Sequence, residues 1–403
     1  MSPEEEEEDG VGEETWDNVD QETFDLREKT PAAEGYWMPA EFEPHEGSWL
    51  LWPQRTDNWR EGARPVQEAV LNVAAAISQF EPVHLGVTPD QFAAVKKQVP
   101  AGVEVASLEY DDIWVRDSGP TFVVSEEPEQ LRSIQWRFNA WGGLYHPYTR
   151  DLTVPRGIST DACGREMRDR YAAPIVLEGG AIHVDGQGTV LLTEECVLNP
   201  NRNPGMSRGQ IEQVLRDYLG GTEFIWLSKG VFNDETSGHI DNLACFAGPG
   251  KVCLAWTDDQ SDPQYAISLD AWERLNDTRD AQGRRLEVFK VPMPGPLHMT
   301  EEEAQGLVPS ESMKRRYAGD RLAGSYVNFY LVNGGLIMPL LDPRTDEKAA
   351  AVLARACPGR VIVGVPAREI LLGGGGLHCI TQQVPSCEIA RTRPGPGPGR
   401  KLH

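Results

Sequence analysis

Four consecutive glycines, Gly373 to Gly376, come shortly before Cys379 near the end of the chain. A glycine backbone can approach a ligand closely and can adopt positive φ. This setting favours Cys379 as a nucleophilic thiol, with an inert buried cysteine as the alternative. The run matches neither GxGxxG nor GxxxxGK[ST], and no helix pattern follows it, so a nucleotide phosphate site is not indicated.

A histidine and three carboxylates are further candidates for chemistry. His239 and Asp241 stand at i and i+2, which places both side chains on one face of an extended segment. They could be metal ligands, but no further His or Cys cluster has usable spacing, and we predict no metal. A proton-transferring histidine beside an orienting carboxylate fits better, since imidazole titrates near neutral pH. Asp117 beside Arg116 and Glu178 before two glycines could instead be an ion pair and a turn cap.

Together these residue types indicate a narrower chemistry. A thiol, a histidine and carboxylates around one pocket suit a planar cation, because guanidinium presents donors in a fork that carboxylates accept bidentately. A guanidinium held beside Cys379 would lower the pKa of the thiol from its reference near 8.5. The substrate would then activate its own nucleophile.

The elements that would position these residues recur along the chain. A hydrophobic strand, a turn rich in Asp, Asn and Pro, an amphipathic helix and a β-branched strand follow one another. The predicted strand, helix and strand run over 48–53, 66–80 and 83–87; 189–193, 209–219 and 223–227; 251–256, 266–275 and 286–290; and 335–341, 347–356 and 360–364, with a degraded copy between 136 and 176. Such units must pack against one another, and the economical arrangement is radial. A doubly wound sheet is the alternative, because it also alternates strands and helices.

Polar residues and glycines follow several of the returning strands. They occupy Asp111 to Pro120, Glu178 to Gly180, Asn233 to Asn242 and Leu372 to Gln383. In a radial fold these places are equivalent and converge on one axis. We therefore predict one site, with a contribution from each segment.

The composition excludes several classes of protein. The chain has 403 residues, 40% hydrophobic and 25% charged, and a net charge of −24, which argues against a nucleic-acid partner. Its longest apolar stretches fall far short of the roughly 20 residues that span a bilayer. The acidic N-terminus lacks the basic and apolar regions of a signal peptide. Seven cysteines without a CxxC pair suggest neither a disulfide framework nor a zinc ribbon. We predict a protein that is neither secreted nor membrane-bound.

The two ends differ from the rest of the chain. The first thirty residues carry thirteen acids and two bases, which is typical of a solvated, disordered extension. The last residues alternate proline and glycine. We predict an acidic disordered tail over 1–34, a single catalytic α/β-propeller domain over 35–390 and a flexible Pro/Gly tail over 391–403.

Seven ordered motifs between residues 35 and 387 resemble those of the agmatine deiminases. They are GYWMPAEFEPHEG from Gly35, WLLWP from Trp49, DIWVRDSGP from Asp112, FNAWGG from Phe138, LEGG from Leu177, GHIDN from Gly238 and GGLHCITQQ from Gly375. That family belongs to the guanidine-modifying (pentein) superfamily. The resemblance implies an α/β fold, a five-bladed pseudo-symmetric propeller of ββαβ repeats. Ser237 departs from the pattern, because we expect Asn or Asp at that place.

The resemblance also implies a role for each matching residue. The matches are Cys379 with the nucleophile, His239 with the acid/base, Glu178 with the carboxylate partner of that histidine, Asp117 and Asp241 with the guanidinium-binding carboxylates, and Trp114 with a tryptophan of the substrate channel. The implied reaction deiminates agmatine to N-carbamoylputrescine and ammonia through a covalent thiouronium, without metal or organic cofactor. It would serve putrescine and polyamine biosynthesis. We expect a cytoplasmic location, and the family implies a homo-oligomer.

Other functions remain open at this point. A deiminase of free arginine or peptidyl-arginine would use the same chemistry but would need a cation for the carboxylate that agmatine lacks. An amidinotransferase would pass the amidino group to an amine. A non-catalytic propeller scaffold would have no reason to keep all five candidate catalytic residues together.

Overall fold

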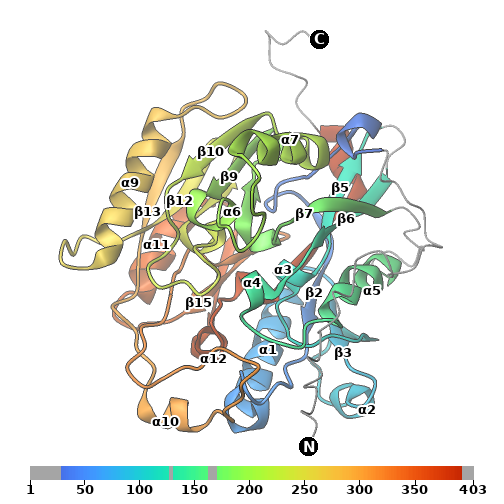
Figure 1. Ribbon diagram of the computed structural model, residues 1–403, viewed down its shortest axis with the longest axis vertical. Helices are drawn as coiled ribbons and strands as arrows, with labels where there is room; N and C mark the ends of the chain where they lie inside the picture. Colours follow the sequence, from blue (N-terminus) through green and yellow to red (C-terminus); the bar gives the residue numbers. More distant parts are fainter. Residues whose placement is uncertain (1–28, 127–129, 162–169, 393–403) are drawn as a thin grey trace, which may run out of the picture.

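The computed structural model describes residues 29–126, 130–161 and 170–392, which form an α/β fold (Figure 1). Their strands are divided among five separate sheets. In Figure 1 the long helices α5, α7 and α9 lie toward the outside of the view, and the short helix α3 lies near its centre. The doubly wound alternative is therefore wrong, because within these described ranges no continuous parallel sheet joins the repeats.

Three sheets share one topology of three strands. Their strands are β8 (Ile182–Val184), β9 (Thr189–Thr193) and β10 (Glu223–Leu227); β11 (Ala244–Gly248), β12 (Lys251–Trp256) and β13 (Glu287–Pro292); and β14 (Tyr330–Val332), β15 (Gly335–Leu340) and β16 (Val361–Pro366). In each, the first two strands are antiparallel and the last two parallel. A helix connects the parallel strands, as such a crossover requires. These helices are α7 (Arg208–Leu219), α9 (Pro263–Asp277) and α11 (Asp346–Ala356).

The other two sheets have four strands each. One contains β1 (Tyr36–Trp37), β5 (Thr121–Ser125), β6 (Gln130–Arg137) and β7 (Arg170–Val176), and the other β17 (Gln382–Pro385), β2 (His45–Leu51), β3 (Val83–Val87) and β4 (Val103–Ser107). Helix α5 (Val154–Asp161) precedes β7, and α1 (Arg64–Ile77) joins β2 to β3. Because β17 pairs antiparallel with β2, strands from opposite ends of the chain complete one sheet.

Short helices fill the connections. They are α2 (Phe92–Val95), α3 (Val115–Ser118), α4 (Ala140–Gly143), α6 (Glu194–Val197), α8 (Ile240–Leu243), α10 (Glu301–Gln305), α12 (Arg368–Leu372) and the 3-10 helices η2 (Ala32–Glu34), η3 (Arg60–Ala63), η4 (Asp151–Thr153), η5 (Gly179–Ala181), η6 (His378–Ile380) and η7 (Cys387–Thr392). Four of them, α3, η5, α8 and η6, stand directly before the first antiparallel strand of a sheet. These four carry the polar segments that the sequence predicts to converge.

Local sequence explains the helices that support the sheets. Along α1, buried apolar residues recur at helical spacing, so one face packs on the core. Helix α7 begins with a capping box between Ser207 and Gln210 and ends at Gly220, whose φ of 72° suits glycine. Strands β9 and β15 lie between two partners and are almost wholly buried, which explains their continuous apolar runs.

The predicted repeats are confirmed in the described residues. Strands β3, β9, β10 and β12 have the predicted bounds, and the four predicted helices correspond to α1, α7, α9 and α11. The degraded copy contains β6, α5 and β7. The repeat pattern alone does not predict the antiparallel strand that begins each sheet.

The predicted tails fall mostly outside the described ranges. Residues 29–34 are described, and Glu34 accepts hydrogen bonds from Arg132 (2.8 Å) and Tyr171 (2.5 Å). The boundary predicted at residue 35 thus lies within the described chain. Across residues 29–126, 130–161 and 170–392, every helix is too short or too polar to cross a bilayer.

Candidate active site

The structure brings the five predicted catalytic residues together from four segments. Asp117 lies in α3, Glu178 precedes η5, His239 and Asp241 stand at the start of α8, and Cys379 lies in η6. None of the five is more than 4% exposed. Three carboxylates, an imidazole and a thiol buried this deeply are costly unless they pair with one another, which points to a functional cluster.

Gly180 marks the point on which three of these side chains converge. A Cβ at this position would lie 2.6 Å from His239 Nδ1, 2.8 Å from Asp117 Oδ1 and 3.0 Å from Asp241 Oδ2. The Gly180 N–H donates to Asp117 Oδ1 over 2.9 Å. Only glycine leaves the backbone close enough to hold Asp117 without a side chain between the three groups.

The Cys379 thiol lies among weak partners. Its Sγ is 3.3 Å from the Gly376 N–H, 3.5 Å from Asn328 Nδ2 and 3.6 Å from Asp241 Oδ2. Burial raises the pKa of the thiol well above its ordinary value, and Asp241 and Asp117 raise it further. In the free site, therefore, Cys379 is protonated.

The glycine run packs closely around this thiol. A Cβ at any position from Gly373 to Gly376 would come within 2.1 to 2.5 Å of a neighbouring atom, and at Gly376 that atom is Asn328 Oδ1. At Gly375 the atom belongs to Trp114, whose indole Nε1 donates to Asp112. The predicted channel residue Trp114 therefore lies against the loop that carries the thiol.

His239 faces carboxylates on both edges of its ring. Nδ1 lies 3.8 Å from Asp117 Oδ2, and Nε2 lies 3.8 Å from Glu178 Oε2. Burial acts to lower the pKa of His239, but Asp117, Cys196 and Glu178 outweigh it and raise the pKa well above its ordinary value. His239 is therefore an imidazolium that can donate a proton into the site.

Arg202 fixes the carboxylate behind His239. Its Nε donates to Glu178 Oε1 over 2.5 Å, and its Nη2 donates to the Thr236 carbonyl over 2.8 Å. Burial acts to raise the pKa of Glu178, but Arg202 and His239 outweigh it and lower the pKa. Glu178 therefore remains an anion, with Oε2 left for His239.

Asp117 is held by neutral donors. Besides the Gly180 N–H, the indole Nε1 of Trp141 donates to Oδ2 over 2.9 Å. Trp141 lies in α4 with a left-handed φ of 55°, a strained conformation for a bulky residue and one that is often found at functional sites. Burial raises the pKa of Asp117 to about 6; the charge of His239 acts to lower it, and Asp241 and Glu178 act to raise it.

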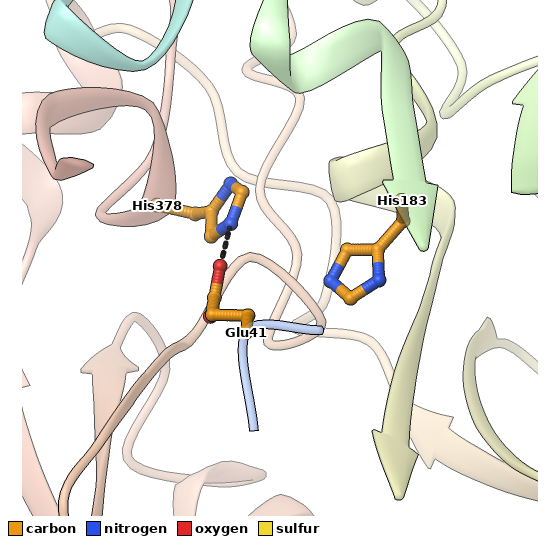
Figure 2. A group of neighbouring side chains, drawn as sticks. All are labelled: Glu41, His183 and His378. Atoms are coloured by element: carbon orange, nitrogen blue, oxygen red, sulfur yellow. Dashed lines mark hydrogen bonds and ion pairs between the residues drawn. The ribbon is translucent and has the colours of Figure 1, made fainter. Parts of the chain in front are cut away.

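Asp241 is held by a charged donor instead. His378 Nδ1 lies 2.9 Å from Asp241 Oδ2, while Oδ1 has no hydrogen-bond partner. Burial acts to raise the pKa of Asp241, but the hydrogen bond and charge of His378 outweigh it and lower the pKa. On the other side of the ring, His378 Nε2 lies 2.7 Å from Glu41 Oε2, as the dashed line in Figure 2 shows.

Two groups of three potential metal ligands occur among the described residues. They are Glu41, His183 and His378, and Glu178, Cys196 and His239. In the first group both nitrogens of His378 already have partners, so it is a hydrogen-bonded network (Figure 2). The second group lies around the proton-transferring histidine and belongs to the same site.

Several residues of the site are not predicted from the sequence. They are Asn328, Arg202, Trp141, Cys196, His378 and Glu41. Asn328 could have been found from the repeats. It lies after β13 and directly before β14, and in the other repeats the predicted site segments lie at the same place, between one sheet and the next. Trp141, His378 and Glu41 lie inside recognised motifs, but nothing in the motifs shows what they contact.

Comparisons with known proteins place this arrangement in a family. Residues 37–385 match the Porphyromonas-type peptidyl-arginine deiminase family. A relative from Pectobacterium atrosepticum is 52% identical over 359 residues, which cover 89% of this chain and 97% of that protein. The agmatine deiminase of Pseudomonas aeruginosa is 50% identical over 363 residues, with 89% and 97% covered. The solved structure of the Enterococcus faecalis agmatine deiminase matches with a TM-score of 0.85 and 42% identity, covering 89% of this chain and 98% of that one.

Proposed function

Because the chain belongs to the Porphyromonas-type peptidyl-arginine deiminase family, we propose that it hydrolyses agmatine to N-carbamoylputrescine and ammonia. Relatives at about 50% identity over nearly the whole domain carry the name agmatine deiminase. The observation that carries the proposal is the placement of Cys379 and His239 beside the carboxylates of Asp117 and Asp241.

The two aspartates would bind the guanidinium. One carboxylate oxygen of each lies within 3.0 Å of the point that a Cβ on Gly180 would occupy, and Asp241 keeps Oδ1 free of any hydrogen bond. A planar cation can therefore donate to both carboxylates at once. Its charge would also lower the pKa of Asp117, which makes binding and ionisation of that residue mutually favourable.

Cys379 would be the nucleophile. In the free site its thiol has a raised pKa, because burial and two carboxylates oppose the thiolate. A bound guanidinium offsets both effects, so the thiol releases its proton to solvent when substrate is present and is protonated again from solvent after product leaves. The thiolate then attacks the guanidinium carbon and forms a tetrahedral adduct.

His239 would transfer protons in both halves of the reaction. As an imidazolium it protonates the departing amino group, ammonia leaves, and an S-alkylthiouronium remains on Cys379. The neutral imidazole then takes a proton from water, and the hydroxide attacks the same carbon. Collapse of this second adduct releases N-carbamoylputrescine and the thiolate. Glu178, held by Arg202, orients the ring and stabilises its charge.

The pairing of Arg316 favours agmatine over arginine. Arg316 lies against Gly374 in the loop before Cys379. Its terminal nitrogens already donate to Asn58 (2.6 Å), Glu235 (2.7 Å) and the Gly373 carbonyl (2.7 Å). A free arginine would need a cation with free donors for its carboxylate, and of the three Arg316 nitrogens only the buried Nε has no hydrogen-bond partner. Agmatine lacks this carboxylate and therefore needs no such cation.

The same proposal extends to the fold, the location and the oligomeric state of the enzyme. Five sheets of like construction, each preceded by a segment that contributes to one site, support a five-bladed α/β propeller. Pairing of β17 with β2 supports a single catalytic domain over residues 35–390. We further propose a cytoplasmic homo-oligomer without metal or cofactor, acting in putrescine and polyamine biosynthesis.

The test is ammonia release from agmatine, free L-arginine and a peptide with C-terminal arginine, with and without a chelator. We expect turnover of agmatine, abolished by Cys379→Ala and retained by Cys387→Ala, a matched change at a half-buried cysteine of η7. Turnover of arginine instead would keep the mechanism and overturn the substrate. No turnover of any of the three would support the scaffold alternative.

A further inference from the structure

Four charged side chains of alternating sign form a buried row that ends at the site. Arg116 Nη2 lies 3.3 Å from Glu41 Oε2, which lies 2.7 Å from His378 Nε2. His378 Nδ1 lies 2.9 Å from Asp241 Oδ2. All four residues are buried, so each charge depends on its neighbours for stabilisation.

The row is fixed by distant parts of the chain. Glu41 lies between β1 and β2, and its Oε1 accepts from the Leu331 N–H in β14 over 3.0 Å. Arg116 in α3 also donates to Gln383 in β17 over 2.7 Å. Figure 2 shows the Glu41 carboxylate directed at the edge of the His378 ring. Strands of two sheets therefore hold the row in place.

The charges within the row are mutually consistent. Burial acts to raise the pKa of Glu41, but His378 and Arg116 outweigh it and hold the pKa well below its usual range. Burial and Arg116 act to lower the pKa of His378, but Glu41 and Asp241 outweigh them and raise it. His183, whose ring centre lies 6.2 Å from that of His378, has a pKa that burial lowers to about 4. Of these two neighbouring imidazoles, the surroundings therefore favour the charged form at His378 and the neutral form at His183.

The row contacts the reacting groups through Asp241. His378 occupies Asp241 Oδ2 and leaves Oδ1 without a partner. The same Oδ2 lies 3.6 Å from Cys379 Sγ, where a carboxylate would repel the thiolate. An imidazolium bonded to that oxygen offsets the repulsion.

We propose that Glu41 and His378 are positioning residues for the reaction: Glu41 holds His378 as an imidazolium, and His378 holds Asp241 with one oxygen directed at the substrate. This inference rests on the proposed function and deepens it. Glu41 bonds to His378 and His378 bonds to Asp241, so each acts through Asp241.

The first test compares the pH dependence of kcat/KM in wild type, Glu41→Gln and His183→Gln. The groups that face His378 are Glu41, Asp241, Arg116, His183, Tyr330 and Cys379. Without the Glu41 charge the His378 pKa falls, so the alkaline limit of activity moves down by about one pH unit or more, and KM for agmatine rises about tenfold. His183→Gln changes a buried neighbour that has no hydrogen bond to Glu41 or Asp241, and it leaves the alkaline limit unchanged. Equal behaviour of the two variants would overturn the proposal.

A second measurement is made on the wild-type protein and does not depend on the activity of any variant. Long-range ¹H–¹⁵N spectra of wild-type protein with labelled histidine, assigned with His378→Gln, report the protonation of His378 directly. We expect an imidazolium at pH 7, and a neutral ring would overturn the proposal. Because this readout is independent of turnover, it distinguishes failure of the inference from failure of the proposed function, in which wild type itself would leave agmatine unchanged.

Discussion

Asp117 and Asp241 lie on two sides of one site and have opposite electrostatic surroundings. Both are buried aspartates in short helices before antiparallel strands. Asp117 accepts from an amide and an indole, and its pKa is raised by burial to about 6. Asp241 accepts from an imidazolium that outweighs burial, and its pKa is lowered.

The difference lies in how closely a cation approaches each carboxylate. The His378 imidazolium is hydrogen-bonded to Asp241 over 2.9 Å, whereas the His239 imidazolium lies 3.8 Å from Asp117 and makes no hydrogen bond to it. Neutral donors and a cation at that distance offset only part of what desolvation costs a buried carboxylate, whereas a hydrogen-bonded cation can exceed that cost. Asp241 is therefore a fixed anion across the pH range in which the enzyme would act, whereas Asp117 is mostly an anion at pH 7 and gains a proton as pH falls through about 6. One aspartate keeps its charge, and the other titrates close to neutral pH.

The largest effect should follow from removal of the fixed anion. Asp241→Asn takes away the charge that attracts the guanidinium and leaves the His378 imidazolium unpaired beside it. We expect kcat/KM for agmatine to fall by about 10³-fold at every pH from 5 to 8. Steady-state kinetics measures this. A defect smaller than that of Asp117→Asn at pH 7 would contradict the assignment of the fixed anion.

Titration of Asp117 should make kcat/KM depend on pH below neutrality. The raised pKa of Asp117 means that the carboxylate gains its proton as pH falls through about 6, so kcat/KM should drop about tenfold for each unit below that value. Asp117→Asn should lose this acid limb, and its defect relative to wild type should shrink at pH 5. A defect that is constant with pH would show that Asp117 does not titrate in this range.

The contrast between the two aspartates marks what the sequence could predict. Both carboxylates, the thiol and His239 stand in motifs after returning strands, and the strand and helix periods are strong enough to locate those strands. Equivalent places in repeated units then predict that the segments converge. This reasoning uses local patterns and topology only.

The charge of the partners could not be predicted in the same way. Glu41 and His378 are separated by 337 residues in the sequence, and Arg202 lies in the connection from β9 to β10, 24 residues beyond Glu178. Which buried cation meets which carboxylate depends on side-chain packing across sheets, for which a single sequence has no periodic signal. The repeats could have indicated Asn328 as a site residue. The connection over 293–329 has no clear periodic pattern, however, so the sequence does not show where the next strand begins.

A smaller change would shift the titration without removing the carboxylate. Trp141→Phe deletes the indole N–H that donates to Asp117 Oδ2 and preserves the aromatic volume. The anion loses one hydrogen bond, so its pKa should rise by about one unit and kcat/KM at pH 7 should fall about twofold. Trp136→Phe is the matched control, because its indole donates to Thr121 in a different contact. An acid limb that moves equally in both variants would exclude the Trp141 hydrogen bond as the cause.

The smallest effect concerns the loop that carries Asp241. Ser237, which replaces the expected Asn or Asp, has a left-handed φ of 68°, a region that Asn tolerates better than Ser. Ser237→Asn should therefore stabilise the protein by about 0.5 kcal/mol, seen as a rise of about 1 °C in Tm. If His378 rather than this loop holds Asp241, kcat/KM should stay unchanged while Tm rises. A change in KM of several-fold would instead show that the backbone before His239 positions the fixed anion, and the contrast between the two aspartates would then have a second origin.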